Sequence, residues 1–174
     1  DLAGNIWIAK ADSGITVMPI KQDSTSIIRN ISQADGLAGN KINAISKDQS
    51  GNIWVGTENS GLSKISLNPK IDSLISEITF YSTNVGLSSN SVKCILTDEG
   101  NRIIIGTAGG GINILNQNEI IQINKSNGLT SNNVYSLIFD NAGNLWAGTE
   151  KGVEKITYDE NFKVKEIRLF AVKD

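Results

Sequence analysis

Histidine is absent from this 174-residue chain, and Cys94 is its only cysteine. Without histidine the chain lacks the commonest general base, the commonest metal ligand and the usual partner of a nucleophilic serine or cysteine. One cysteine can form neither an intramolecular disulfide nor a cysteine-rich zinc site. The composition therefore excludes most familiar catalytic arrangements from this chain.

Basic clusters and long apolar runs are also missing. The formal net charge is -2 at pH 7, which gives no reason to expect nucleic acid or an anionic membrane as a partner. No apolar run approaches the roughly 20 residues that span a bilayer, and no N-terminal segment resembles a signal peptide. The first residues already lie inside a repeat, so we expect that the true N-terminus is missing.

Four in-phase copies of one phrase organise the sequence. The clearest copies, at 48–57 and 140–149, consist of an Asp-x-x-Gly-Asn turn, an apolar run with a tryptophan, and Gly-Thr. A weaker copy lies at 98–107, and a partial copy opens the chain at 1–9. The first Asp residues are 47, 50 and 42 positions apart (48−1, 98−48, 140−98). A period of about 40–50 residues is typical of a propeller blade, a kelch-type unit or a helical repeat.

The pattern inside each copy favours β-structure. The apolar runs at 53–55, 103–105 and 145–147 are short, bounded by Gly and Asn, and rich in β-branched and aromatic residues. No segment has apolar residues at helical spacing over three turns. We therefore predict an all-β chain of β-propeller blades, each a four-stranded antiparallel sheet, with three complete blades and one three-stranded partial blade.

The strands of each repeat are named A to D in chain order. Strand A is predicted at 41–47, 91–97 and 133–139, and strand B at 52–57, 102–107 and 144–149. Strand C is predicted at 61–67, 111–115 and 152–157, and strand D at 74–82, 120–124 and 163–170, with a Pro69-containing connection before the first of these. The opening repeat has only B (5–9), C (14–18) and D (26–31). Residues 1–174 form a single partial propeller with blades at about 1–34, 35–83, 84–126 and 127–174.

The turn aspartates and the tryptophans each allow two interpretations. Repeated Asp could bind calcium, but no second acidic residue follows at the required spacing, so we predict a turn in which Asp caps backbone N–H groups and Gly supplies a positive φ. Trp7, Trp54 and Trp146 could be carbohydrate platforms. Ile104 replaces one of them at the same spacing, and isoleucine cannot stack a sugar ring. We therefore predict that the tryptophans pack between blades.

Each strand A has apolar or small residues on both faces, with Ala44, Cys94 and Ser136 in its middle. This pattern is expected of an innermost strand covered on both sides, which makes Cys94 a buried small hydrophobe. A Gly-Leu-x-x-Asn phrase, at 36–40 and equivalently at 86–90 and 128–132, precedes each strand A. We expect the leucine to fill the gap between blades and the asparagine to satisfy backbone groups of its loop.

Taken together, these phrases resemble the two-component regulator propeller repeat over essentially the whole chain. The copy at 98–107 departs from it, because Ile103-Ile104-Ile105 replaces the Trp phrase and the turn is shifted by one residue; Ala9 also replaces Gly in the first copy. The resemblance implies a seven-bladed propeller, often one of two in tandem. Such propellers form the periplasmic or extracytoplasmic sensor region of hybrid histidine-kinase regulators, many of which respond to polysaccharide fragments.

A propeller ring holds about 4–8 blades, and this chain has fewer than four complete ones. An open ring leaves apolar blade faces exposed to water. We therefore expect a piece of a larger propeller, whose partners are the remaining blades of the parent, or a half that pairs with a second copy.

The leading hypothesis is a non-enzymatic sensor segment that binds an oligosaccharide, needs no cofactor or metal, and passes a signal to a histidine kinase. Its working face should carry the D-to-A and B-to-C loops, whose amide, carboxylate and ammonium groups can hydrogen-bond sugar hydroxyls. The candidate ligand-binding residues are Asn40, Lys41, Glu58, Asn59, Asn90, Ser91, Asn132, Asn133, Glu150 and Lys151. The loop at 108–110 has no bulky side chain and would leave room there.

Two alternatives stay open. Antibiotic-inactivating propeller lyases have similar blades but use a metal-assisted site with a catalytic histidine, so that activity would lie outside this segment. A carboxylate pair is the remaining chemistry, yet the turn aspartates should lie at the opposite end from Glu58 and Glu150. A protein-interaction scaffold would need exposed aromatic residues near its outer strands. The candidates for that role are Phe80, Tyr81, Tyr158 and Phe162.

Overall fold

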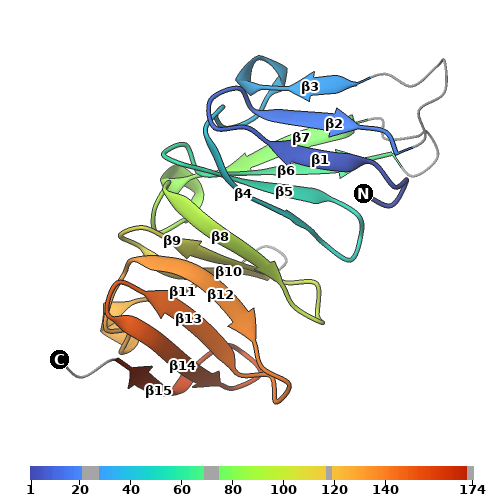
Figure 1. The fold of residues 1–174 in the computed structure, drawn as a ribbon. Coiled ribbons are helices and arrows are strands. Elements are labelled where there is room, and N and C mark those ends of the chain that lie inside the picture. Colours follow the sequence, from blue (N-terminus) through green and yellow to red (C-terminus); the bar gives the residue numbers. More distant parts are fainter. Residues whose placement is uncertain (21–27, 69–74, 117–118, 172–174) are drawn as a thin grey trace.

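The computed structural model describes residues 1–20, 28–68, 75–116 and 119–171. Within these ranges fifteen strands form four antiparallel sheets that follow one another along the chain and stand side by side in an open arc (Figure 1). Three sheets have four strands and one has three. The predicted fold, a partial β-propeller, is confirmed.

Each sheet is one blade with its strands in chain order. Blade 1 contains β1 (Ile6–Ala9), β2 (Ile15–Met18) and β3 (Arg29–Ile31). Blade 2 contains β4 (Ile42–Lys47), β5 (Ile53–Thr57), β6 (Leu62–Leu67) and β7 (Ile75–Tyr81). Blade 3 contains β8 (Val92–Thr97), β9 (Ile103–Thr107), β10 (Gly111–Asn116) and β11 (Glu119–Ile123). Blade 4 contains β12 (Val134–Phe139), β13 (Leu145–Thr149), β14 (Gly152–Tyr158) and β15 (Val164–Phe170).

The predicted strand boundaries differ from the described ones by no more than one residue, except at the start of β3, where Ile28 was predicted to lie in the strand but the strand begins at Arg29. The predicted starts at 26 and 74 and the Pro69 connection lie outside the described residues. A short 3-10 turn precedes each of the strands β4, β8 and β12 and was not predicted: η1 (Gln33–Asp35), η2 (Thr83–Val85) and η3 (Lys125–Asn127).

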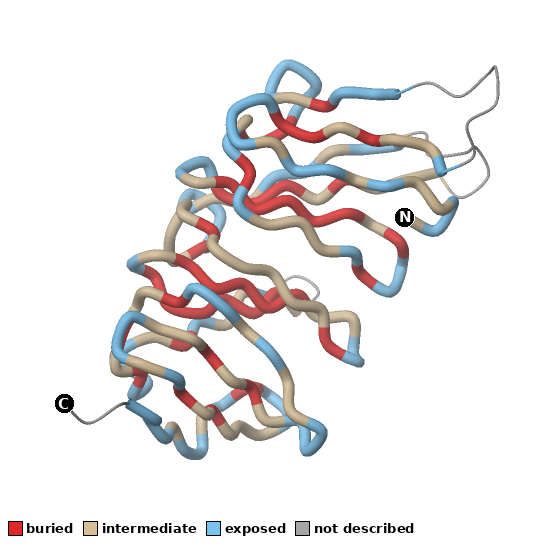
Figure 2. Tube along the Cα trace, viewed as in Figure 1, coloured by how far each residue is buried: buried red, intermediate tan, exposed pale blue. Residues whose placement is uncertain are grey.

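The apolar core lies between the blades, because side chains alternate along each strand. Ile53 and Val55 pack toward blade 1, whereas Trp54, between them, packs toward blade 3. A third cluster joins blades 3 and 4. Leu37, Leu87 and Leu129 are each 3% exposed and belong to the three clusters in turn, as predicted for residues that fill the gaps. Figure 2 shows the buried residues concentrated along the strands and the exposed ones at the turns.

The aspartate turns have the predicted capping role and a second one. In blade 2 the Asn52 backbone N–H donates to Asp48 Oδ1 at 2.9 Å, and Gly51 has φ +86°. The Trp54 indole also donates to Asp48 Oδ2 at 2.9 Å. Trp7 and Trp146 make the same bond with the aspartates that begin their copies. Each tryptophan therefore fixes its own turn.

Blade 3 reaches the same result with different residues. Its turn aspartate, Asp98, accepts a hydrogen bond from the Arg102 guanidinium where the other copies use an indole, and Asn101 adopts the positive φ. Ile104 is smaller than tryptophan, and Phe162 from the C-to-D turn of blade 4 packs in the same cluster. Phe162 is 2% exposed, stacks on Tyr158 at 4.6 Å and lies under the Arg102 guanidinium at 4.3 Å.

Three of the four aromatic residues predicted near the outer strands pack between blades. Phe162 and Tyr158 pack between blades 3 and 4, and Tyr81 packs on Trp54 at 5.6 Å between ring centroids. Of the four aromatic residues predicted to lie near the outer strands, Phe80 is the large hydrophobic residue that stays exposed, at 62%.

The prediction that strand A is covered on both sides is wrong. Apart from the buried first residue, β4, β8 and β12 are half-buried or exposed, because each is the inner edge strand of its sheet and one flank faces the axis. Cys94 is accordingly only partly buried, although burial still raises the pKa of its thiol to about 11. None of the sheets in the described residues covers the outer face of blade 4, so Ile138 is 64% exposed and Trp146 is only partly buried.

Candidate functional site

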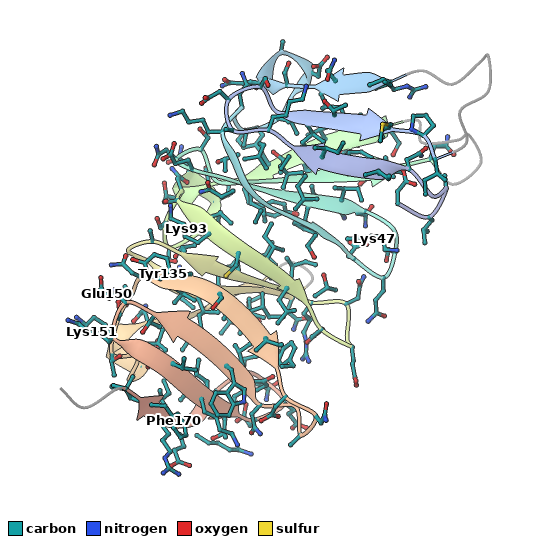
Figure 3. All side chains as sticks on the ribbon, in the orientation of Figure 1. Lys47, Lys93, Tyr135, Glu150, Lys151 and Phe170 are labelled. Atoms are coloured by element: carbon teal, nitrogen blue, oxygen red, sulfur yellow. The ribbon has the colours of Figure 1, made fainter. Side chains whose placement is uncertain are left out.

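The D-to-A loops and B-to-C loops lie at one end of the blades, which we call the loop face. All ten candidate ligand-binding residues lie on these loops. The A-to-B turns lie at the other end of the strands, so Asp48 and Glu58 are separated by the length of β5. Figure 3 shows Lys93, Tyr135, Glu150 and Lys151 toward the loop face and Lys47 at the opposite end.

The three asparagines of the Gly-Leu phrase build their own loops, as predicted. Asn40 Oδ1 accepts a hydrogen bond from the Gln33 backbone N–H at 2.7 Å. Asn90 and Asn132 do the same for the first residues of η2 and η3, at 2.9 Å in both cases. Their amide oxygens are therefore occupied by backbone of the 3-10 turn.

A buried polar residue on strand C anchors each of these loops from below. Ser63 accepts a hydrogen bond from the Ala38 backbone N–H at 2.9 Å, and Asn113 accepts one from the Ser88 backbone N–H at 2.9 Å. In blade 4 the corresponding residue is Glu154, which is 0% exposed and accepts from both the backbone and the hydroxyl of Thr130. The loop face thus rests on a rigid support in all three blades.

At the junction of blades 1 and 2 the charged candidates are loosely paired. Lys41 Nζ lies 3.3 Å from Glu58 and 4.0 Å from Asp12. The side chains of Lys41 and Glu58 are 62% and 41% exposed, and an exposed ion pair of this kind contributes little stability. Both groups can reorient toward a ligand. Asn59, in the same loop, is exposed.

The junction of blades 3 and 4 holds a carboxylate in a fixed position. Ser131 Oγ donates to Glu150 Oε1 at 2.9 Å, and Asn133 Nδ2 donates to Glu150 Oε2 at 2.8 Å. These bonds, Asn133 first, lower the pKa of Glu150, and the charges of Lys151 and Lys125 add to the effect. Glu150 is therefore a negatively charged acceptor on an exposed surface.

The B-to-C loop of blade 3, at 108–110, is hydrogen-bonded to this network. Asn133 Oδ1 accepts a hydrogen bond from the Gly109 backbone N–H at 2.8 Å, which joins the B-to-C loop of blade 3 to blade 4. Ser91 likewise supports the loop, since its carbonyl accepts from the Ala108 N–H at 2.8 Å. No described atom lies within 4 Å of the position that a β-carbon on Gly109 would take, so the surface above it stays open.

Sequence reasoning missed three residues on the inner strands. The pairing of strands A and B shifts register once in each of blades 2, 3 and 4, and Asn43, Lys93 and Tyr135 are the extra residues at these shifts. A β-bulge of this kind redirects a side chain. Asn43 donates to the Val92 carbonyl of the next blade at 2.9 Å, while Tyr135 is 51% exposed. The signal in the sequence was one position that changes from Asn to Lys to Tyr between otherwise similar copies.

The loop face is a surface rather than a pocket. A groove of about 610 Å³ lies elsewhere, on the outer rim between β11 and the C-to-D turn of blade 4, and none of the candidate residues lines it. Within the four described ranges, no three His, Cys, Asp or Glu residues are grouped so that they could hold a metal ion. The same part of the chain contains no helix that is long and apolar enough to cross a membrane.

Comparison with known families identifies the repeat. The profile of the two component regulator propeller family matches residues 36–59 and 128–151, which contain the Gly-Leu phrase, the inner strand and the Trp strand of blades 2 and 4. These two segments match the two component regulator propeller repeat. The departures of blade 3, where Arg102 and Ile104 replace the Trp arrangement, lie outside the matched segments. No curated protein sequence matches the chain.

Solved structures show the same fold. The extracellular domain of the putative hybrid two component system BT3049 from B. thetaiotaomicron aligns over 98% of this chain, with a TM-score of 0.77 and 20% identity. The extracellular domain of the putative hybrid two component system BT4673 from the same organism aligns over 95% of this chain, with a TM-score of 0.73 and 18% identity. The chain spans only 22% and 23% of the length of these proteins. Virginiamycin B lyase from Staphylococcus aureus aligns over 99% of the segment and 53% of its own chain, with a TM-score of 0.65 and 18% identity. At such identities the likeness concerns the fold alone.

Proposed function

We propose that this propeller segment is a non-enzymatic sensor module located outside the cytoplasm, and that its loop face binds an oligosaccharide. The observation that carries the proposal is the convergence, at one end of three adjacent blades, of loop polar groups and redirected inner-strand residues. The two-component family match and the fold shared with extracellular sensor domains support the same role. In the whole protein, ligand binding would be passed on to a histidine kinase.

The chemistry of the junction between blades 3 and 4 suits a sugar. Tyr135 offers an exposed aromatic ring, and such rings stack on the apolar face of a sugar. The bulge that carries Tyr135 lies against Thr149, the residue before Glu150. Glu150 is an acceptor held by two hydrogen bonds, while the ammonium group of Lys151 is exposed. An aromatic ring flanked by charged acceptors and donors can recognise a ring and its hydroxyl groups together.

The experiment is calorimetric titration of the chain with a panel of oligosaccharides, followed by two substitutions on the loop face. Tyr135→Ala and Glu150→Gln change exposed side chains, so the fold should be retained. Each should weaken binding about tenfold, which corresponds to about 1.4 kcal/mol.

Lys47→Ala is the matched control, because Lys47 is exposed but lies at the opposite end of the blades (Figure 3). It should leave the affinity unchanged. Equal losses in all three variants, or binding that persists in both loop-face variants, would place the ligand elsewhere.

A further inference from the structure

The junction of blades 3 and 4 contains smaller side chains than the junction of blades 2 and 3. On blade 2, Trp54 and Tyr81 pack with ring centroids 5.6 Å apart, and Lys64 Nζ lies 5.6 Å from the centroid of the indole. The strand pairing gives the equivalent positions of blade 3, which are Ile104, Ile123 and Ile114 in the same order. Three isoleucines therefore replace two rings and a lysine chain, and they leave space beside blade 4.

Phe162 fills only part of this space. Its ring is 2% exposed, and beside it a groove of about 610 Å³ follows β11. The pocket at the junction of blades 2 and 3 has a volume of about 280 Å³. Small-molecule sites commonly have volumes of about 300–1,000 Å³, so the groove is large enough for a ligand. Its two walls come from adjacent blades, and all the residues that line it are among the described ones.

Aliphatic side chains form the floor of the groove. Ile121 and Ile123 of β11 and Val164 of β15 line it, and all three pack in the cluster shared by blades 3 and 4. Ile121 and Val164 are half-buried, so part of each side chain remains accessible. Phe162, the aromatic residue in the lining, is almost fully buried and offers no ring on which a sugar could stack. The floor therefore suits a branched aliphatic group.

Polar side chains gather at one end of the groove. Asn116 ends β10 and Glu119 begins β11, whereas Asn161 and Lys163 precede β15, which starts at the same end of the blades. Glu119 and Lys163 are exposed, and neither forms an ion pair within the described ranges. The side-chain amides of Asn116 and Asn161 likewise have no hydrogen bond to another described residue. A free carboxylate and a free ammonium group thus stand on opposite walls.

We propose that this groove binds a free amino acid with a branched aliphatic side chain, such as leucine. The Glu119 carboxylate accepts hydrogen bonds from the α-ammonium group of the ligand, and the Lys163 ammonium group donates to its α-carboxylate. A zwitterion matches two walls of opposite charge, and both contacts are charge-assisted hydrogen bonds. The aliphatic side chain lies along the floor over Ile121 and Val164. The site is separate from the loop face, since none of the candidate sugar-binding residues lines the groove.

The test is isothermal titration calorimetry of the chain with L-leucine, N-acetyl-L-leucine and L-leucinamide. Leucine should bind saturably, with one molecule per chain. Acetylation removes the positive charge of leucine and amidation removes the negative one, so each analogue should bind about tenfold or more weakly. Equal binding of the three compounds, or no saturable binding of leucine at millimolar concentrations, would overturn the proposal.

Two substitutions connect each charge of the ligand with its partner in the groove. Glu119→Gln and Lys163→Gln change exposed side chains, so circular dichroism should report an unchanged fold, and each should weaken leucine binding about tenfold. Glu119→Gln should also remove the preference for leucine over N-acetyl-leucine, because the ammonium group has then lost its partner. Lys163→Gln should do the same for leucinamide.

Glu77→Gln is the matched control. Glu77 is exposed and occupies in blade 2 the position that Glu119 has in blade 3, at the junction that Trp54 and Tyr81 fill. It should leave the affinity for leucine unchanged. Equal losses in Glu77→Gln and Glu119→Gln, or unchanged leucine binding in both groove variants, would contradict the proposal. The affinity of the loop face for oligosaccharides should not respond to Glu119→Gln, so the two sites can fail independently.

Discussion

Phe162→Ala tests whether the stability of blade 3 depends on a side chain contributed by blade 4. Phe162 comes from a turn of blade 4, yet it packs in the core between blades 3 and 4 together with Ile104, the residue that stands where the other copies have tryptophan. Removing its ring should open a cavity at this interface. The two blades should then unfold more easily, because the ring packs in the cluster that they share.

The expected loss follows from the burial and contacts of the ring. Phe162 is 2% exposed, and Phe→Ala changes at buried positions cost about 3–5 kcal/mol. The ring also stacks on Tyr158 at 4.6 Å and lies 4.3 Å from the Arg102 guanidinium; both contacts are lost together with it. Alanine keeps the positive φ of 58° at this position, so no backbone strain is relieved to compensate.

The assay is urea denaturation followed by tryptophan fluorescence and circular dichroism. Phe80→Ala is the control, since it makes the same change at a 62% exposed position and should shift the free energy of unfolding by no more than about 0.5 kcal/mol. If Phe162→Ala abolishes folding, Phe162→Leu keeps most of the volume and should lose less stability than alanine does, while still losing the ring contacts with Tyr158 and Arg102.

A second variant tests whether Phe162 fills the space that a tryptophan fills in the other copies. With Phe162 already changed to alanine, Ile104→Trp should restore part of the lost stability, because an indole then fills the gap as Trp54 does between blades 2 and 3. In the unchanged background Ile104→Trp should destabilise by about 1–3 kcal/mol through overpacking. A loss of less than about 1 kcal/mol for Phe162→Ala, or additive effects in the double variant, would refute the reasoning.

Three further predictions follow from other parts of the chain. Gly56→Ala should cost about 1–3 kcal/mol in urea denaturation, since a β-carbon there would overlap Val92 Cγ1 of the next blade; a loss well below about 1 kcal/mol would contradict the close approach. Gly109→Ala has no such overlap and should show only the cost of about 1–2 kcal/mol for its φ of +85°. Hydrogen bonds from the Trp146 indole and from Asn144 hold the pKa of Asp140 well below its usual range, so the folded state binds fewer protons than the unfolded state. Its stabilising effect is then complete above the unfolded pKa of about 3.9 and lost as the pH falls toward the folded value; unfolding of Asp140→Asn should show a weaker acid dependence, and an unchanged profile would argue against it. Because burial raises the pKa of Cys94 to about 11, its alkylation at pH 8 should be much slower in the folded chain than in denaturant, and equal rates would show an accessible thiolate.

The repeat made the strands predictable. Each blade has the same short apolar runs and the same glycine and aspartate turns, so several copies of the repeat support each predicted strand. The three strands β5, β9 and β13 start one residue later than predicted and end where predicted. The 3-10 turns before the inner strands were missed, because their hydrogen bonds with Asn40 and its equivalents depend on the loop path rather than on a local propensity.

The structure places the loops that carry the ten candidate residues at one end of the blades. Loop residues such as Asn40 and Ser91 hold the loops through hydrogen bonds, whereas the exposed Tyr135 lies at a bulge of the inner strand. A bulge exists only when two strands pair out of step, and pairing involves residues that the sequence alone does not bring together. The fixed position of Glu150 likewise depends on Ser131 and Asn133 from another loop.

The sequence by itself determined the class of fold, the number of blades, the strand boundaries and the absence of histidine chemistry, because periodicity and composition are local properties of the chain. Only the tertiary structure decided which copies depend on a neighbour. Ile104 lies in a fully packed blade because Phe162, 58 residues further along the chain (162−104), packs in the same cluster. Trp146, which occupies the same place in its repeat as the buried Trp54, is only partly buried because none of the described sheets covers it. Burial is set by what stands against a residue in space, and one repeat cannot specify its neighbour.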